Sequence, residues 1–233
     1  ALYVLKCIGQ AVREEYSNAA NETNRNAKDV QINQYFQWIR HAGASRCSAW
    51  CQSAMGAMSV FLPWIQQENS RVEAAVQYTI AIVREAGNNG NGGDGGIIVD
   101  YALTGLSELC SRCAKTLSTP EALSWMLTSL DPSSVLTLPT SSRIRITEAI
   151  FGVISRCTQY DIIVQCTETA LHLTMSRLST NASNSFSPED GKMDLNIGAV
   201  VAADICVVAA ALTRLQYVRC PPSSTITGGG GGN

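Results

Sequence analysis

The stretch STPEALSWMLTSL, residues 118–130, holds the signals of a helix start and of a helical face within one short segment. Two hydroxyl residues come first, and Pro120 and Glu121 then suit the first turn of a helix. The apolar residues that follow recur at helical spacing: Leu123, Trp125, Met126 and Leu130. The stretch therefore predicts a helix over residues 120–130.

The same 3.6-residue period dominates the rest of the chain, and no convincing alternation typical of a strand is found. A second start signal is the capping-box spacing of Ser70 and Glu73, and Gly87 stands where a C-terminal glycine belongs. We expect an all-α fold with helices at roughly 1–17, 28–41, 45–67, 70–87, 97–117, 120–130, 141–157, 160–178 and 194–219.

Polar and glycine-rich segments separate these helices. Residues 18–26 are rich in asparagine, six of the ten residues 87–96 are glycine, and residues 179–192 are polar. We expect flexible loops at 87–96 and 179–192, a helical domain over 1–220, and a disordered Ser/Thr/Gly tail over 221–233. The glycine-rich loop does not resemble a phosphate cradle, because no Gly-Lys-Ser/Thr motif follows it.

Alternate helices begin near residues 1, 45, 97, 141 and 194, at steps of about 44, 52, 44 and 53 residues. Without the long loops the period falls to roughly 40–47 residues, which is the range of HEAT and armadillo units. We therefore expect antiparallel helix pairs that stack into a solenoid. The alternative is a closed multi-helix bundle without a repeat.

Two short segments carry a family resemblance. SRVEAAV at 70–76, and SRIR at 142–145 followed by Glu148, Ala149, Ile150 and Gly152, resemble the start of the second helix of a HEAT repeat. Unequal helix pairs with long inserted loops are similar to those of importin-β and exportin nuclear transport receptors. This resemblance implies a non-catalytic scaffold that binds another protein, and a chain that is a segment of a longer array.

Composition argues against several function classes. The 17 basic and 19 acidic residues give a net charge of −2, so no basic footprint for nucleic acid or for an anionic membrane is present. The apolar stretch 197–212 contains Asp204 and is shorter than the ~20 residues that cross a bilayer. We expect this stretch to form a buried helix rather than a membrane span.

The nine cysteines fall mostly on apolar helical positions, as do Cys7, Cys157, Cys166 and Cys206. There they behave as small hydrophobic side chains, which favours a reducing compartment, the cytoplasm or the nucleus. The alternative is a helical-bundle enzyme or a metal or redox protein that uses two cysteine pairs, Cys47/Cys51 and Cys110/Cys113. Both pairs lie inside helical patterns and no strand precedes the second, so we expect no enzyme and no metal or cofactor.

Few other residues suggest chemistry. His41 and His172 have no neighbouring signature of a nucleophile, and Arg143–Arg145 and Arg214–Arg219 are sparse basic points. Three tryptophans fit buried faces, whereas Trp38 could be an exposed anchor for a partner. We therefore assign no catalytic, cofactor-binding or metal-binding residue, and the protein-binding residues stay unassigned. The tryptophans expected to be buried are Trp50, Trp64 and Trp125.

Overall fold

The structure is a computed structural model of the chain. It describes residues 29–30, 32–37, 47–88, 95–185, 195–216 and 218, together with isolated helical positions at 7, 10, 11 and 14. Of these described residues, 89% are helical and none is in a strand. The all-α prediction is confirmed. The predicted loop at 18–26, the tail at 221–233, and Trp38 and His41 lie outside the described residues.

Residues 29–30 and 32–37 are helical, and nine labelled helices follow them in the described part of the chain. Their bounds are α3 Ser48–Ile65, α4 Asn69–Asn88, α5 Gly95–Arg112, α6 Ala114–Leu117, α7 Pro120–Leu130, α8 Pro132–Leu136, α9 Thr140–Ile154, α10 Tyr160–Ser185 and α11 Leu195–Leu215.

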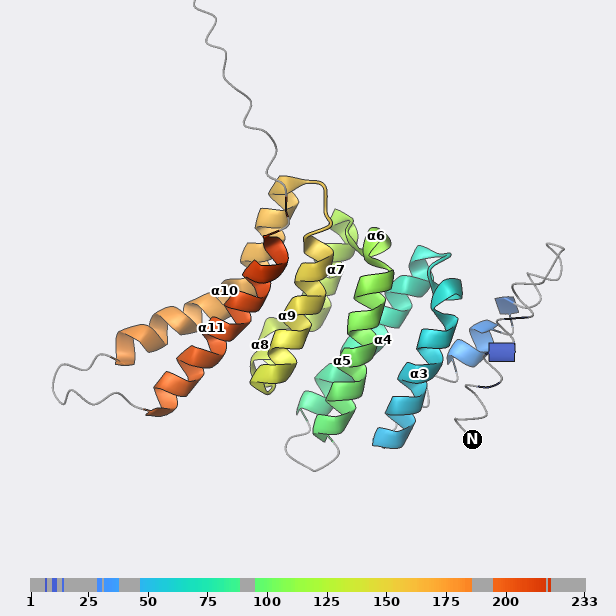
Figure 1. Cartoon of the computed structure of the whole chain (residues 1–233), viewed down its shortest axis with the longest axis horizontal. Helices are drawn as coiled ribbons and strands as arrows, with labels where there is room; N and C mark the ends of the chain where they lie inside the picture. Colours follow the sequence, from blue (N-terminus) through green and yellow to red (C-terminus); the bar gives the residue numbers. More distant parts are fainter. Residues whose placement is uncertain are drawn as a thin grey trace, which may run out of the picture.

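The long helices form two layers. In the first layer α3, α5, α9 and α11 lie side by side in that order (Figure 1), and each contacts the next. The second layer follows the order α4, α7 and α10, and it joins the first through contacts such as α4 with α5 and α10 with α11. The chain therefore alternates between the layers as it advances along the longest axis.

The core lies between these layers and along each row. On α3 the buried positions Ala54, Met58, Phe61 and Ile65 recur at helical spacing, as an amphipathic helix requires. Small residues bring helices close together. A Cβ atom added at Gly105 of α5 would lie 2.6 Å from the Met55 sulfur of α3, so the Met55 side chain packs closely against this glycine.

The predicted helix over 120–130 is confirmed at both ends. Thr119 is the N-cap, and its hydroxyl oxygen accepts a hydrogen bond from the Ala122 amide at 3.3 Å. Pro120 occupies the first helical turn, where no partner for its nitrogen is needed.

Two terminal signals on α4 were interpreted wrongly. The Ser70/Glu73 capping box is absent because α4 already begins at Asn69, and the Ser70 hydroxyl donates to the Glu68 carboxylate at 2.5 Å. Gly87 does not end the helix, which continues to Asn88. A Cβ atom at this glycine would lie 2.6 Å from a methyl carbon of Leu138, so close packing explains Gly87.

Four predicted boundaries also change. The helix expected over 97–117 is interrupted at Cys113, which separates α5 from α6. No helix was expected between residues 130 and 141, but Pro132–Leu136 form α8, because the Asp131 carboxylate accepts a hydrogen bond from the Ser133 amide at 3.3 Å. Helix α10 extends to Ser185, so residues 179–185 of the loop expected at 179–192 are helical, and residues 186–192 lie outside the described part. The loop expected at 87–96 is helical at both ends, and residues 89–94 lie outside the described part.

Candidate protein-binding site

Helix α11 lies at the end of the first layer, and most of its surface is exposed. Only Asp204, Val207 and Ala211 are buried among its described side chains, so the expectation of a buried helix is wrong. The side chain of Ile205 is 55% exposed and that of Leu212 is 58% exposed. We define the α11 face by the exposed apolar residues of the helix: Ala199, Val200, Ala202, Ile205, Cys206, Ala209 and Leu212.

An exposed apolar face of this length on a helix is typical of a surface that contacts another protein. The segment Asn196–Leu215 is also the one helix in the described part that is long and apolar enough to cross a membrane by length and composition.

Asp204 anchors α11 to the two layers. Its side chain is completely buried and accepts hydrogen bonds from Arg143 of α9 and Arg177 of α10. The Arg177 Nε atom donates to Asp204 Oδ2 at 2.6 Å. Arg143 is itself only 4% exposed, whereas Arg177 is 27% exposed. We call these three residues the ion cluster; it connects three helices.

The charges of the ion cluster compensate one another. Burial alone would raise the pKa of Asp204, but the hydrogen bonds and positive charges of Arg177 and Arg143 outweigh burial and lower this pKa. The hydrogen bond with Asp204 in turn raises the pKa of Arg177. A carboxylate that is ionised and fully engaged in this way positions a helix; it is not available as an acid or a base.

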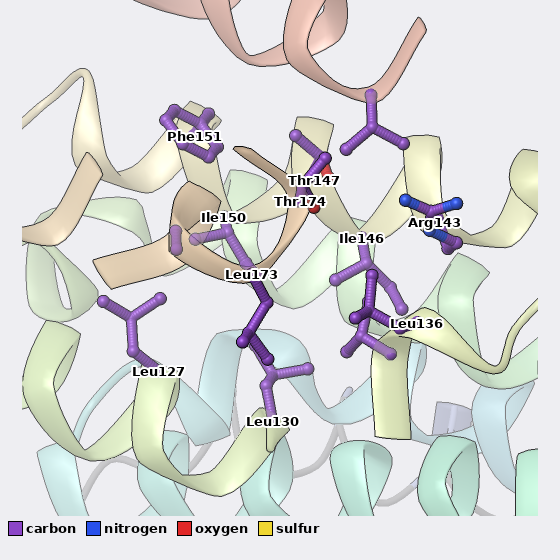
Figure 2. A pocket seen from close by; sticks show the side chains of 13 residues that line it. Leu127, Leu130, Leu136, Arg143, Ile146, Thr147, Ile150, Phe151, Leu173 and Thr174 are labelled. Carbon is purple, nitrogen blue, oxygen red and sulfur yellow. The ribbon is translucent and has the colours of Figure 1, made fainter. Parts of the chain in front are cut away.

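A small apolar cavity lies beside the ion cluster. Its volume is about 50 Å³, and its lining comes from α7 to α11, with Leu127, Leu130, Ile150 and Leu173 among the lining residues shown in Figure 2. Sites for cofactors and small molecules usually span roughly 300–1,000 Å³. The cavity is therefore too small for such a ligand.

A larger and more polar pocket opens where α5, α9 and α11 meet. Its volume is about 260 Å³, and we call it the α5–α9–α11 pocket. Its lining combines charged side chains, hydroxyl groups and a glycine. Its lining residues are Ser107, Cys110, Ser111, Glu148, Ala149, Gly152, Arg156 and Arg214.

The cysteine pairs do not form a site. Burial raises the pKa of Cys51 to about 11, that of Cys110 to about 12 and that of Cys113 to about 11. These side chains are therefore neutral thiols near pH 7, and the fourth, Cys47, is exposed. No group of three or more possible metal ligands occurs among the residues that the structure describes, so the four thiols do not assemble into a zinc site.

The other singled-out residues are placed as follows. Cys157 and Cys166 are buried as expected, but Cys7 and Cys206 are exposed. Trp64 is buried, Trp125 is half-buried, and Trp50 is 39% exposed because it precedes the buried stripe of α3 by one residue. His172 is exposed on α10. Arg145 is half-buried and forms an ion pair with the exposed Asp100 at 3.1 Å, and Arg143, expected to be a basic surface point, is buried in the ion cluster.

No family model matches the sequence, and neither a curated protein nor a solved structure matches the chain. The geometry of the helices and of their exposed surfaces is therefore the basis of the functional argument.

Proposed function

We propose that this chain is a non-catalytic protein-interaction scaffold whose helix pairs stack as a HEAT/armadillo-like solenoid, as in nuclear transport receptors. Its partner would be another protein of the cytoplasm or the nucleus. The observation that supports this proposal is the alternation of the chain between two layers that end in the exposed α11 face.

The alternation matters because a stacked array buries each helix pair against its neighbours. In the first layer α5 lies between α3 and α9, and α9 lies between α5 and α11. Helix α11 contacts α9 and α10 but has no such neighbour on its far side within the described part of the chain. In a stacked array of helix pairs, an exposed apolar helix face of this kind is expected where a further helix pair or a partner protein packs.

The charge distribution on α11 supports the same proposal. From Ile197 to Thr213 the helix has one charged side chain, Asp204, which is buried and compensated by the ion cluster. The α11 face therefore offers no unpaired charge, and burying it against an apolar partner surface would carry no desolvation penalty for an ion.

The solenoid is tested by small-angle X-ray scattering of the purified chain. A closed domain of 233 residues has a radius of gyration of about 17–18 Å. We expect a clearly larger value and an elongated distance distribution. A compact particle with the closed-domain radius would contradict the solenoid.

The scaffold function is tested by a matched pair of substitutions. Ile205→Glu places a charge on the α11 face, whereas Ile97→Glu changes an isoleucine of similar exposure, 45%, at the start of α5. Proximity labelling in the source cells compares both variants with the unchanged chain. We expect some labelled proteins to be absent from the set obtained with Ile205→Glu and still present in the set obtained with Ile97→Glu. Identical sets of labelled proteins for the three chains would contradict the proposal.

The alternative of a metal or redox protein that uses the cysteine pairs stays a hypothesis. The described residues offer no observation that favours it, since three of the four thiols are buried with raised pKa values.

A further inference from the structure

We propose that the α5–α9–α11 pocket binds the carboxylate side chains of an acidic segment of a partner protein. This inference rests on the proposed scaffold function and names the chemistry of one of its partners. It concerns a different surface from the α11 face.

The pocket is built on the face of α9 that points between α5 and α11. Glu148 and Gly152 are four residues apart and lie on one face of α9, and Arg156 comes from the turn that follows the end of this helix at Ile154. Ser107 and Ser111 have the same spacing on α5, and Arg214 comes from the last turn of α11. Three elements thus direct polar side chains into one concave space of about 260 Å³.

Both arginines retain unused hydrogen-bond donors. A guanidinium group has five N–H donors in a planar arrangement. Arg156 uses one of them, from Nη1 to the Ser111 carbonyl oxygen at 3.4 Å. Arg214 Nη2 lies 3.7 Å from Glu148 Oε1, which is longer than a hydrogen bond. Each arginine can therefore still receive a carboxylate in the bidentate manner typical of this pair.

The pocket has a net positive charge of one, because two arginines oppose one glutamate. The Arg214–Glu148 ion pair is weak, since the two side chains are 49% and 42% exposed and water screens them. An incoming carboxylate would therefore compete easily for Arg214. The hydroxyls of Ser107 and Ser111 have no partner within the described part of the chain, and both can donate to an anionic oxygen.

The size of the pocket suits the carboxylate side chains of a peptide. A volume of about 260 Å³ suits one or two side chains of a peptide rather than a whole cofactor. Both arginines would attract a phosphate as well as a carboxylate, so competition by inorganic phosphate is part of the test below. We therefore assign the pocket to aspartate and glutamate side chains of an extended acidic segment.

Gly152 provides a direct way to block the pocket. A Cβ atom added there would have no atom within 4 Å outside its own helix, so a larger side chain would extend into open space. Gly56 on α3 is equally open and does not line the pocket. Both replacements also remove a helical glycine, so their effects on helix stability match.

The test uses the full chain and a fluorescein-labelled ten-residue peptide of alternating Glu and Ser, with binding followed by fluorescence anisotropy at low salt. We expect Arg156→Gln and Arg214→Gln each to raise the Kd by about tenfold or more, because each variant loses one charge-assisted contact. We expect a similar rise in Kd for Gly152→Leu, because the leucine side chain would occupy the pocket. Gly56→Leu should leave the Kd unchanged. Circular dichroism of each variant shows whether the fold is retained.

Three results would overturn the assignment. Binding that Gly152→Leu does not weaken would place the peptide elsewhere on the protein. Equal binding of the same peptide with Gln in place of Glu would remove the role of the carboxylates. Displacement of the peptide by inorganic phosphate at a lower concentration than by acetate would assign the pocket to phosphate. If the particle is elongated in solution but the peptide does not bind, only the assignment of the pocket is refuted. A compact particle refutes the solenoid scaffold, whether or not the peptide binds.

Discussion

Replacing Asp204 by asparagine tests whether the ion cluster holds α11 in place. The substitution keeps the shape of the side chain but removes its negative charge. Arg143 is only 4% exposed, so its guanidinium would stay buried without a counterion. Removing one partner of a buried ion pair costs about 3–5 kcal/mol. That is a large part of the roughly 5–15 kcal/mol that stabilises a typical folded protein.

The free energy of unfolding is measured by urea denaturation at pH 7, followed by far-UV circular dichroism. Glu148→Gln is the matched control, because it also neutralises an acidic partner of an arginine on the same helices. Its ion pair with Arg214 is exposed and 3.7 Å long, so we expect a loss below about 1 kcal/mol. A loss for Asp204→Asn no greater than that of the control would refute the reasoning.

The pH dependence gives a second readout of the same substitution. The pKa of Asp204 is lower in the folded chain than in the unfolded chain, where it is about 3.9. The stabilising contribution is therefore fully present above this unfolded value and is lost as the pH falls through the folded pKa. We expect the difference in stability between the unchanged chain and Asp204→Asn to be constant from pH 5 to 7 and to shrink in more acidic solution.

The double variant Arg143→Met/Asp204→Leu shows whether Asp204→Asn destabilises the fold by leaving a buried charge uncompensated or by losing a contact. It removes the buried charges together and leaves Arg177, which is partly exposed and can turn to solvent. Because apolar replacements of buried ion pairs are often neutral or stabilising, we expect it to recover most of the stability that Asp204→Asn loses.

Further expected outcomes concern the cap and the thiols. Thr119→Ala removes the acceptor of the Ala122 amide, and we expect a loss of about 1 kcal/mol in the free energy of unfolding. Ser118→Ala, one residue earlier, is the control and should cost less. With Ellman's reagent at pH 8 the exposed Cys47 should react at once, whereas Cys110, with its pKa raised to about 12, should react only as the chain unfolds. Fast reaction of Cys110 in the folded chain would contradict its burial.

Local signals predicted the helices well where the cap and the core spacing agree. The helix over 120–130 was predicted at both ends, since the hydroxyl residue and Pro120 mark its first turn and the apolar spacing ends at Leu130. The same kind of signal failed at Ser70, where Glu68 precedes the helix and accepts the Ser70 hydroxyl. Gly87 could not be interpreted correctly from sequence because its neighbour, Leu138, lies about fifty residues away.

The ion cluster was missed for the same physical reason. Arg143 and Asp204 are 61 residues apart, and no local pattern pairs them. One signal was available: a single carboxylate inside a long apolar stretch must be compensated once it is buried. The polar pocket was equally hidden, because it combines side chains from α5, α9 and α11 that only the stacking of helices brings together.

The ion cluster also constrains how this protein can change over generations. A single substitution at Asp204 or at Arg143 leaves an unpaired buried ion, so each first step is costly although the two-step replacement is tolerated. Among descendants of a common ancestor, the two positions should therefore be inherited and exchanged as a unit. Arg177 is partly exposed to solvent, so we expect substitutions at this position to be less costly. Co-variation of positions 143 and 204, with 177 more variable, is the pattern to seek in related sequences.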